Sequence, residues 1–301
     1  MNPLIILRII HPHIVAGGIL AYSLGVLLAL VEGGTLNPLL IALGYGVVFL
    51  GDLSTHFGND YFDVEMDAQI KTKKFFSNTK ILVNNPQLRP LAKSVSLTLL
   101  ALSIILSAVV VIFFGVPIEF FVIALAANLL GWAYSAPPLR LVSRGLGELI
   151  IAVATGFIIP SIGYLLVKGQ LDPIFVSLSM PFMLYGLFLS LNLEAPEIES
   201  DQKGQKGTLA VRIGKRNVFI VVLVIPLFAT LTFLALFLQL SSNVLDLKTL
   251  FLFSLIPVTA SIIGFVTFFQ RRELNRFSTL NICSLFLLII FLNVYFYLLL
   301  A

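Results

Sequence analysis

Charged residues and cysteine are scarce in this sequence. Only 11% of its 301 residues are charged, while 58% are hydrophobic and the mean hydropathy is +1.03. A soluble globular domain usually carries about 25% charged residues, so this composition excludes an ordinary soluble fold. The single cysteine, Cys283, excludes a disulfide framework and a cysteine-based metal site.

Long apolar runs fill most of the chain instead. A run of about 20 apolar residues has the length of a membrane helix. The runs leave no room for a separate soluble domain, so we predict one all-α transmembrane domain over 1–301 with about nine spans. The first run has no small-residue cleavage site after a basic start and is interpreted as a retained helix. The runs are 12–31, 37–57, 94–115, 117–134, 146–167, 174–193, 217–240, 249–269 and 279–300.

The basic residues predict the orientation. Of the 19 Lys and Arg residues, all but Lys168 and Lys248 lie before the first run or in the even-numbered connections. Because Lys and Arg collect on the cytoplasmic side of membrane helices, we predict a multi-pass cell-membrane protein with its N-terminus and these loops in the cytoplasm. The net charge of +4 is explained by this topology. The expected macromolecular partner is therefore the lipid bilayer and not a nucleic acid.

Two long inner connections, about 60–93 and 194–216, begin with acidic clusters of one spacing, acid-x-x-acid-x-x-x-acid. On a helix that turns by about 100° per residue, the three acids of each cluster lie within about 60° of one another. The additional acids Glu65 and Glu199 are expected to point away, towards solvent. The two clusters are Asp60, Asp63 and Asp67, and Glu194, Glu197 and Asp201.

Three carboxylates on one helix face repel one another and are costly to remove from water, so a positive group should compensate them. A single cluster is well explained as a solvated helix face, but two with the same spacing favour a metal site. Mg²⁺ prefers oxygen ligands and often combines a few carboxylates with substrate phosphates. Two such faces across a cavity can hold Mg²⁺ ions against a diphosphate, with nearby Lys and Arg side chains on the remaining phosphate oxygens.

Other polar residues lie inside the apolar runs. His56 and Asp52 lie on the same helix face as the first acidic cluster, further into the membrane run. An acid inside a membrane helix favours a functional role, and the alternative for Asp52 is to brace His56. Asn128 is expected to line a cavity or to join two helices by a hydrogen bond. Glu148 lies one turn after Arg144, and we predict a structural pair between them.

Three segments resemble the UbiA superfamily of intramembrane prenyltransferases. "NDYFDVEMD" (59–67) resembles the N-D-x-x-D-x-x-x-D signature of that family. "DQKGQKGTLAVRIG" (201–214), which follows the second cluster, resembles the second acidic motif with its Gly-x-x-Thr-Leu-Ala-x-x-x-Gly tail. "YSAPPLRLVSRGLGE" (134–148) resembles the segment between the fourth and fifth helices. The resemblance extends over nearly the whole chain.

The resemblance implies helices around a central cavity that Asp-rich loops cap on the cytoplasmic side. It also implies Mg²⁺-dependent transfer of a polyprenyl group from an allylic diphosphate to an acceptor, usually an aromatic quinone precursor. Where many members have Asp in the second motif, this chain has Glu194 and Glu197, and Pro196 between them is expected to kink or start a helix.

The residue roles follow by position. Asn59, Asp60 and Asp63 are the predicted catalytic residues. The expected metal ligands are Asp60, Asp63, Asp67, Glu197, Asp201 and Glu194. The expected diphosphate contacts are Asn59, Lys80, Arg140, Arg144 and Arg212, with Lys203 and Lys206 ranked after them. The expected acceptor or cavity residues are Tyr134, Ser135, His56 and Asn128.

Two alternatives remain at this point. An ion-coupled transporter also carries intramembrane acids and Gly- or Pro-interrupted helices, although its ionisable groups usually lie near the middle of the membrane. Prenyl transfer to a non-aromatic acceptor, such as a glycerol-phosphate ether lipid or haem, also agrees with the motifs. The D-G-x-x-A-R pattern of lipid alcohol phosphotransferases is absent from the sequence.

Overall fold

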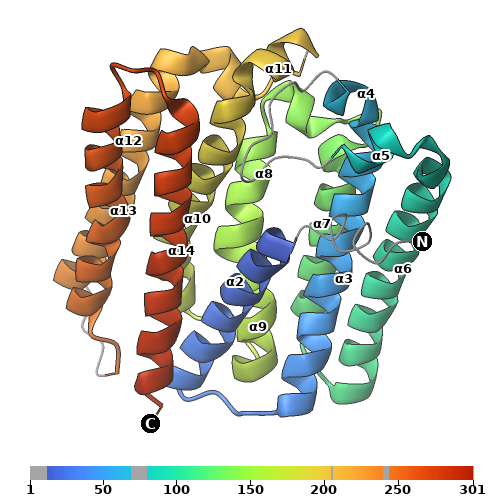
Figure 1. Cartoon of the computed structure of the whole chain (residues 1–301). Helices are drawn as coiled ribbons and strands as arrows, with labels where there is room; N and C mark the ends of the chain where they lie inside the picture. Colours follow the sequence, from blue (N-terminus) through green and yellow to red (C-terminus); the bar gives the residue numbers. More distant parts are fainter. Residues whose placement is uncertain (1–11, 69–79, 205, 240–243, 301) are drawn as a thin grey trace.

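The structure, a computed structural model, describes residues 12–68, 80–204, 206–239 and 244–300 (Figure 1). These residues form helices and no strand, which confirms the predicted all-α fold. Eight helical stretches among them are long and apolar enough to cross a bilayer, and Val15–Val31 is a shorter apolar helix. The count of nine spans and the orientation of the N-terminus stay predictions. Part of the first acidic connection, 69–79, lies outside the described residues.

The first half of the chain builds one side of the bundle. Helix α3 packs against both α6 and α7, and α2 packs against α9. The helices of this half are α2 (Pro12–Val31), α3 (Pro38–Phe62), α4 (Val64–Asp67), α5 (Ile81–Asn84), η1 (Pro86–Leu88), α6 (Arg89–Phe114), α7 (Ile118–Ser135), η2 (Leu141–Arg144), α8 (Gly147–Val153), η3 (Ala154–Ile158) and α9 (Ile159–Lys168).

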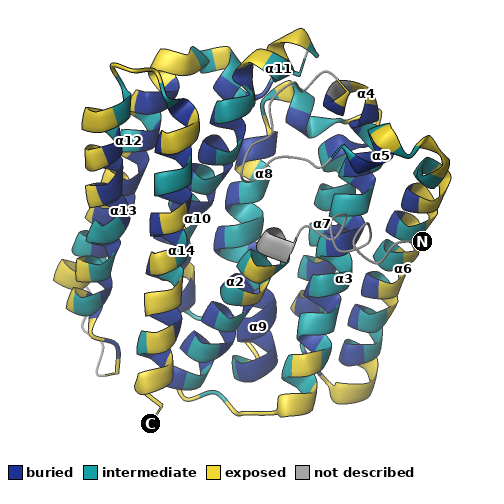
Figure 2. Ribbon diagram, viewed as in Figure 1, coloured by how far each residue is buried: buried dark blue, intermediate teal, exposed yellow. Residues whose placement is uncertain are grey.

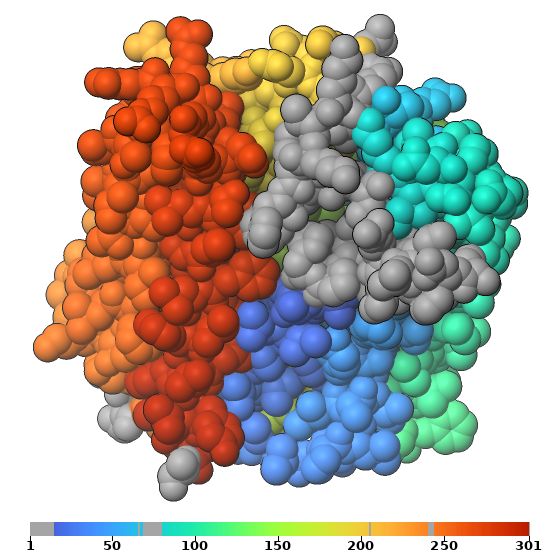
Figure 3. Space-filling view, in the orientation of Figure 1, coloured from blue at the N-terminus to red at the C-terminus, as the bar shows by residue number. Residues whose placement is uncertain are grey.

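The second half builds the other side and closes the ring. Helices α10, α12, α13 and α14 pack in that order, and α14 also contacts α2, beside which it lies in Figure 3. The helices of this half are α10 (Pro173–Glu194), η4 (Ala195–Glu197), α11 (Ile198–Lys203), α12 (Leu209–Gln239), α13 (Leu247–Phe268) and α14 (Leu274–Leu298).

Local sequence sets several helix starts at the end of the bundle opposite the acidic segments. Asn37 accepts a hydrogen bond from the Leu40 N–H at 3.2 Å, and Asp172 accepts one from the Phe175 N–H at 3.1 Å. In both cases a proline follows directly as the first helical residue. A capping side chain satisfies an otherwise unpaired N–H, and proline supplies a backbone angle already suited to a helix.

The outer helices carry many exposed residues (Figure 2), and large apolar side chains are frequent among them. Ile112, Phe113 and Val266 are each more than 70% exposed. Exposed apolar surface on this scale is costly in water and is normal for helices that face lipid.

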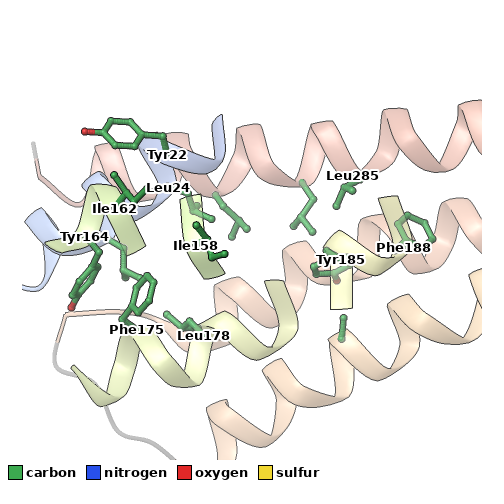
Figure 4. Close-up of a cluster of buried hydrophobic side chains, with 14 of the residues drawn as sticks. Tyr22, Leu24, Ile158, Ile162, Tyr164, Phe175, Leu178, Tyr185, Phe188 and Leu285 are labelled. Carbon is green, nitrogen blue, oxygen red and sulfur yellow. The ribbon is translucent and has the colours of Figure 1, made fainter. Parts of the chain in front are cut away.

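The core lies between the two halves, where Figure 4 shows aromatic and aliphatic side chains of α9, α10 and neighbouring helices in contact. The span Gly147–Lys168 is not a uniform α-helix, because η3 in its middle is a π-helical turn. A Cβ atom added to Gly156 in this turn would lie 2.2 Å from the Met183 nitrogen of α10. Glycine therefore allows the two backbones to approach closely, at a kind of turn that is frequent at functional sites.

Both acidic segments lie at the same end of the bundle, where α4 and α11 are seen at the top of Figure 1. Helix α3 continues to Phe62, so Asn59 and Asp60 are helical, and Asp63 separates α3 from α4. In the second segment Pro196 lies in the 3-10 turn η4, which separates α10 from α11. Each acidic cluster thus spans a break between a long helix and a short one.

Candidate active site

The first acidic cluster turns its carboxylates into the protein. Asp60, Asp63 and Asp67 are 6%, 8% and 8% exposed, whereas Glu65 is exposed. The period of a helix predicts this separation, and the break at Asp63 does not disturb it. Three acids of one chain segment therefore share a buried site.

The second cluster behaves in the same way. Glu194 and Asp201 are buried, Glu197 is half-buried, and Glu199 is exposed and forms an ion pair with Lys215. One carboxylate oxygen of Glu194, Oε2, is buried without a hydrogen-bonding partner among the described residues. A buried carboxylate oxygen in that state is costly unless a cation or a donor meets it in the functional complex.

Lys206 connects the two clusters. Its Nζ lies 3.6 Å from Oδ2 of Asp63, and its backbone N–H donates to the Asp201 carbonyl at 2.8 Å. Burial acts to lower the pKa of Lys206, but the negative charges of Glu194 and Asp63 outweigh it and raise that pKa well above its usual range. The ammonium group is therefore held charged among carboxylates from both segments.

The pKa of Asp67 reflects charges from both acidic clusters. Burial, followed by the charges of Asp63 and Asp60, raises the pKa of Asp67 to about 8. Lys206 lowers this pKa and Glu197 of the second cluster raises it further. The site carries more negative charge than Lys206 alone compensates, which suits the binding of a divalent cation.

The carboxylates of the two clusters can supply part of the ligand set of Mg²⁺. Within the described ranges, no three His, Cys, Asp or Glu side chains converge closely enough to form a ready-made metal site. Mg²⁺ usually keeps several waters and takes one or two carboxylates together with substrate phosphates. Buried carboxylates from two segments, with the unpaired Oε2 of Glu194 among them, match that mode of binding.

The end of α7 and the segment that follows it supply further polar groups. Ser135 donates a hydrogen bond to Oδ1 of Asn59 at 2.6 Å, which fixes the amide of the first motif. Arg140 places Nη2 at 3.5 Å from Oδ1 of Asp63 and at 3.3 Å from the Phe62 carbonyl. Two predicted site residues, Ser135 and Arg140, therefore contact the same acidic helix end.

The other predicted basic residues are placed differently. Arg144 is exposed and donates to the Pro138 carbonyl at 2.8 Å. Arg212 is exposed too and donates to the carbonyls of Gly207 and Arg144, at 3.0 and 2.8 Å. Lys80 is half-buried and directly precedes α5. The Arg212 side chain joins two loops, whereas the Arg144 side chain bonds within its own loop. Contact of these basic residues with a diphosphate stays a prediction.

The structure places Glu148 differently from the sequence prediction. The predicted pair with Arg144 is wrong, because Oε1 of Glu148 accepts hydrogen bonds from the N–H groups of Leu209 and Ala210, at 2.5 and 3.4 Å. These N–H groups begin α12 and have no partner within that helix. Glu148 is 1% exposed, so it caps α12 from inside the protein and fixes the loop that carries Lys206.

An apolar cavity of about 320 Å³ opens beneath the acidic clusters. Its polar lining includes Asn59, Tyr134 and Glu194 near the clusters. His56 and Asp52, which precede Asn59 on α3 by about one and two turns, line it deeper in the bundle. Asn128 lines it as well and joins α7 to α6 through a 3.0 Å hydrogen bond from Nδ2 to Ser103. Asn128 therefore lines the cavity and joins two helices, and its contact with an acceptor stays a prediction.

Asp52 and His56 form the predicted pair, with Oδ1 of Asp52 at 3.2 Å from Nε2 of His56. A second cavity of about 130 Å³ lies between α2, α10 and α14, and Asp52 lines this cavity too. Thr155 of the π-helical turn also contributes to both cavities. The two cavities therefore share a wall.

Comparison with known proteins identifies the class. The UbiA prenyltransferase family matches residues 19–290, so the chain belongs to this family. It is a multi-pass membrane protein and a prenyltransferase, which favours the enzyme over the transporter alternative. No curated protein sequence matches the chain significantly.

Solved structures share the fold. A UbiA homolog from Archaeoglobus fulgidus superposes with a TM-score of 0.72 at 16% identity, covering 98% of this chain and 99% of that one. The same homolog bound to DMAPP and Mg²⁺ gives 0.67 at 18% identity, covering 94% and 98%. A digeranylgeranylglyceryl phosphate synthase gives 0.61 at 18% identity, covering 93% of both chains.

Proposed function

We propose that this protein transfers a polyprenyl group from an allylic prenyl diphosphate to an aromatic quinone precursor, with Mg²⁺ as cofactor. The reaction takes place in one transmembrane domain of a cell-membrane protein, with the acidic clusters facing the cytoplasm. One observation carries the proposal: two buried acidic clusters, linked by Lys206, lie at the mouth of an apolar cavity.

The charges at this mouth suit a diphosphate only together with a cation. Asp60, Asp63 and Asp67 on one side and Glu194, Glu197 and Asp201 on the other would hold Mg²⁺, which supplies Lewis-acid charge neutralisation when bound. Asn59, Arg140 and Lys206 would bind diphosphate oxygens, and Lys80, Arg144 and Arg212 are the further candidates. In this arrangement the carboxylates bind the metal and the basic groups bind the substrate directly.

The cavity provides what the prenyl group needs. When the C–O bond breaks, its electron pair leaves with the diphosphate and an allylic cation forms, which water would destroy. The apolar walls exclude water, and Tyr134 places an aromatic ring near the mouth, where a ring face attracts a cation. The chain's own residues thus bind the leaving group and protect the cation.

The relatives support the donor and leave the acceptor open. The Archaeoglobus fulgidus homolog binds DMAPP and GPP with Mg²⁺, which agrees with a prenyl diphosphate donor. The similar digeranylgeranylglyceryl phosphate synthase is the reason to test a glycerol-phosphate lipid beside aromatic acceptors. Prenyl transfer to such a lipid is the second candidate function.

The test uses purified protein in nanodiscs and two matched variants of the same helix end, Asp63→Ala and the exposed Glu65→Ala. We expect geranylgeranyl diphosphate to raise the unfolding temperature only with Mg²⁺, in the wild type and in Glu65→Ala but not in Asp63→Ala. Radiolabelled transfer to a dihydroxynaphthoate, a glycerol-phosphate lipid and haem then identifies the acceptor. Diphosphate binding that ignores both Mg²⁺ and Asp63→Ala would reject the proposal.

A further inference from the structure

Asp52 is a carboxylate placed far from the metal clusters. It precedes Asn59 by two helical turns on α3, which corresponds to about 10 Å along the helix axis. It lines both the 320 Å³ cavity and the 130 Å³ cavity, and its side chain is 20% exposed. Among the described residues that line the smaller cavity, it is the only carboxylic acid.

The smaller cavity has the size and the lining of a seat for one aromatic ring. A dry cavity of about 150 Å³ lined by apolar side chains is large enough to bind benzene. Here about 130 Å³ is lined mostly by small and aliphatic residues, including Gly17 and Gly18 of α2 and Leu285 of α14. The hydroxyl of Tyr185, which also lines it, donates to the Ser254 carbonyl and is engaged elsewhere. Asp52 is then the polar group that a hydroxylated ring can address.

The chemistry of the proposed function requires a proton acceptor of this kind. Transfer breaks the C1–O bond of the prenyl diphosphate and forms a bond between C1 and the acceptor. The acceptor must lose one proton in every turnover, whether it reacts through a ring carbon or through a hydroxyl oxygen. An apolar cavity offers no bulk water to take that proton, so a side chain in the wall has to do so.

We infer that Asp52 is the general base of the reaction and receives the acceptor's hydroxyl proton, an inference that rests on the proposed function. The acceptor ring occupies the smaller cavity with its hydroxyl towards Asp52, while the prenyl chain occupies the larger one. The C1–O electron pair leaves with the diphosphate and an allylic cation forms. Removal of the hydroxyl proton makes the neighbouring ring carbon electron-rich, and that carbon attacks C1 of the cation. The carbon-bound proton then moves to the ring oxygen and restores the hydroxyl, so Asp52 holds the one proton that the acceptor loses and releases it when the product leaves.

His56 is a positioning residue in this scheme. Its Nε2 lies 3.2 Å from Oδ1 of Asp52, on the same face of α3 one turn nearer to the diphosphate site. The other oxygen, Oδ2, faces α2, where a Cβ atom added to Gly18 would lie 3.7 Å from it. The imidazole thus orients one oxygen of the carboxylate and leaves the other directed towards the wall of the smaller cavity.

The experiment compares Asp52→Asn, which keeps shape and removes the base, with Asp52→Glu, which keeps the base. Glu32→Gln serves as the control, since Glu32 lies just after α2 at the opposite end of the bundle. Each protein is studied in nanodiscs with geranylgeranyl diphosphate, Mg²⁺ and a series of hydroxylated aromatic acceptors of increasing hydroxyl acidity. Substrate binding is followed by the Mg²⁺-dependent thermal shift, and transfer by single-turnover and steady-state rates.

We expect Asp52→Asn to lower kcat by about 100-fold or more, the range of general base catalysis. The KM for the prenyl diphosphate and its thermal shift should stay within about threefold of the wild type. The loss should shrink as the acceptor hydroxyl becomes more acidic, because an acceptor that is already ionised needs no base. Asp52→Glu should recover part of the rate, and Glu32→Gln should keep all of it.

Two results would overturn the inference. One is an Asp52→Asn enzyme that keeps more than a third of the wild-type kcat. The other is a loss of rate that is the same for every acceptor, which would indicate a structural role for the pair. A wild type that shows neither Mg²⁺-dependent binding nor transfer would reject the proposed function itself. This outcome differs from the two results above, which reject only the role of Asp52.

Discussion

Replacing Lys206 by methionine tests the charge balance of the acidic site directly. Lys206→Met keeps the length of the side chain and removes the ammonium, whose Nζ lies 3.6 Å from Asp63 and is largely buried. At an effective dielectric constant of about 20, one such contact represents about 5 kcal/mol of attraction. The cost of burying the ammonium offsets part of it, and breaking a buried pair typically costs about 3 kcal/mol or more.

We therefore expect the metal-free Lys206→Met protein to be about 3 kcal/mol less stable than the wild type. For a chain of this size, about 2 °C in unfolding temperature corresponds to 1 kcal/mol, so the shift should be about 6 °C. Saturating Mg²⁺ brings its own positive charge to the carboxylates and should reduce the difference to less than about 2 °C. The assay is thermal unfolding in detergent or nanodiscs with and without Mg²⁺.

Lys203→Met is the matched control, because Lys203 lies in the same connection and is exposed. It should shift the unfolding temperature by less than about 1 °C. The reasoning fails if Lys206→Met behaves like this control in the absence of metal. It also fails if Mg²⁺ leaves the difference between Lys206→Met and the wild type unchanged.

Three further changes have defined outcomes. Ser135→Ala removes the 2.6 Å hydrogen bond to Asn59. Since a typical hydrogen bond contributes about 1 kcal/mol, the KM for prenyl diphosphate should rise about fivefold. An unchanged KM in steady-state kinetics would contradict the role of Asn59. Glu148→Ala leaves the first N–H groups of α12 without an acceptor and should lower the free energy of unfolding by about 2 kcal/mol. The measurement is amide hydrogen exchange at 209–212, which should become faster, and unchanged exchange would refute the capping role. Gly156→Ala should lower the free energy of unfolding by about 3 kcal/mol or prevent folding, because its Cβ would lie 2.2 Å from the Met183 nitrogen. Gly17→Ala, whose Cβ would lie 3.7 Å from Phe286, should be tolerated. A fluorescence-detected assay of folded protein compares the two variants.

The sequence predicts the membrane helices well because their burial in lipid requires uninterrupted apolar runs. It predicts their ends less well at the side of the acidic clusters. Helix α6 begins at Arg89 instead of 94, α14 at Leu274 instead of 279, and α3 continues to Phe62 instead of 57. Polar residues can continue a helix beyond the hydrocarbon region, and hydropathy reports only the part inside it.

The acidic site is predictable as far as one helix face is concerned. The helical period separates the buried acids from the exposed Glu65 and Glu199, and the structure confirms that separation. The part played by Lys206 could not be derived in this way, because one basic residue in a loop resembles another. Its place depends on a tertiary contact with Asp63, more than 140 residues earlier in the chain.

The mistaken pair of Glu148 and Arg144 has the same origin. A spacing of four residues predicts a contact only if both residues belong to one helix. Here Arg144 ends the 3-10 turn η2 and Glu148 lies in α8, with Gly145 between them in a left-handed conformation. Glu148 then meets backbone groups of α12, which no local pattern could reveal.

The seam between α2 and α14 has a consequence for how the enzyme is made. The smaller cavity is walled by α2 on one side and by Ile282, Leu285 and Phe286 of α14 on the other. During synthesis α2 is made long before α14, so the wall that Gly17 and Gly18 form lacks its α14 partner until that helix is inserted. The smaller cavity is therefore completed last, and a chain that ends before residue 274 lacks both the α14 wall of this cavity and the helix against which the second acidic segment packs.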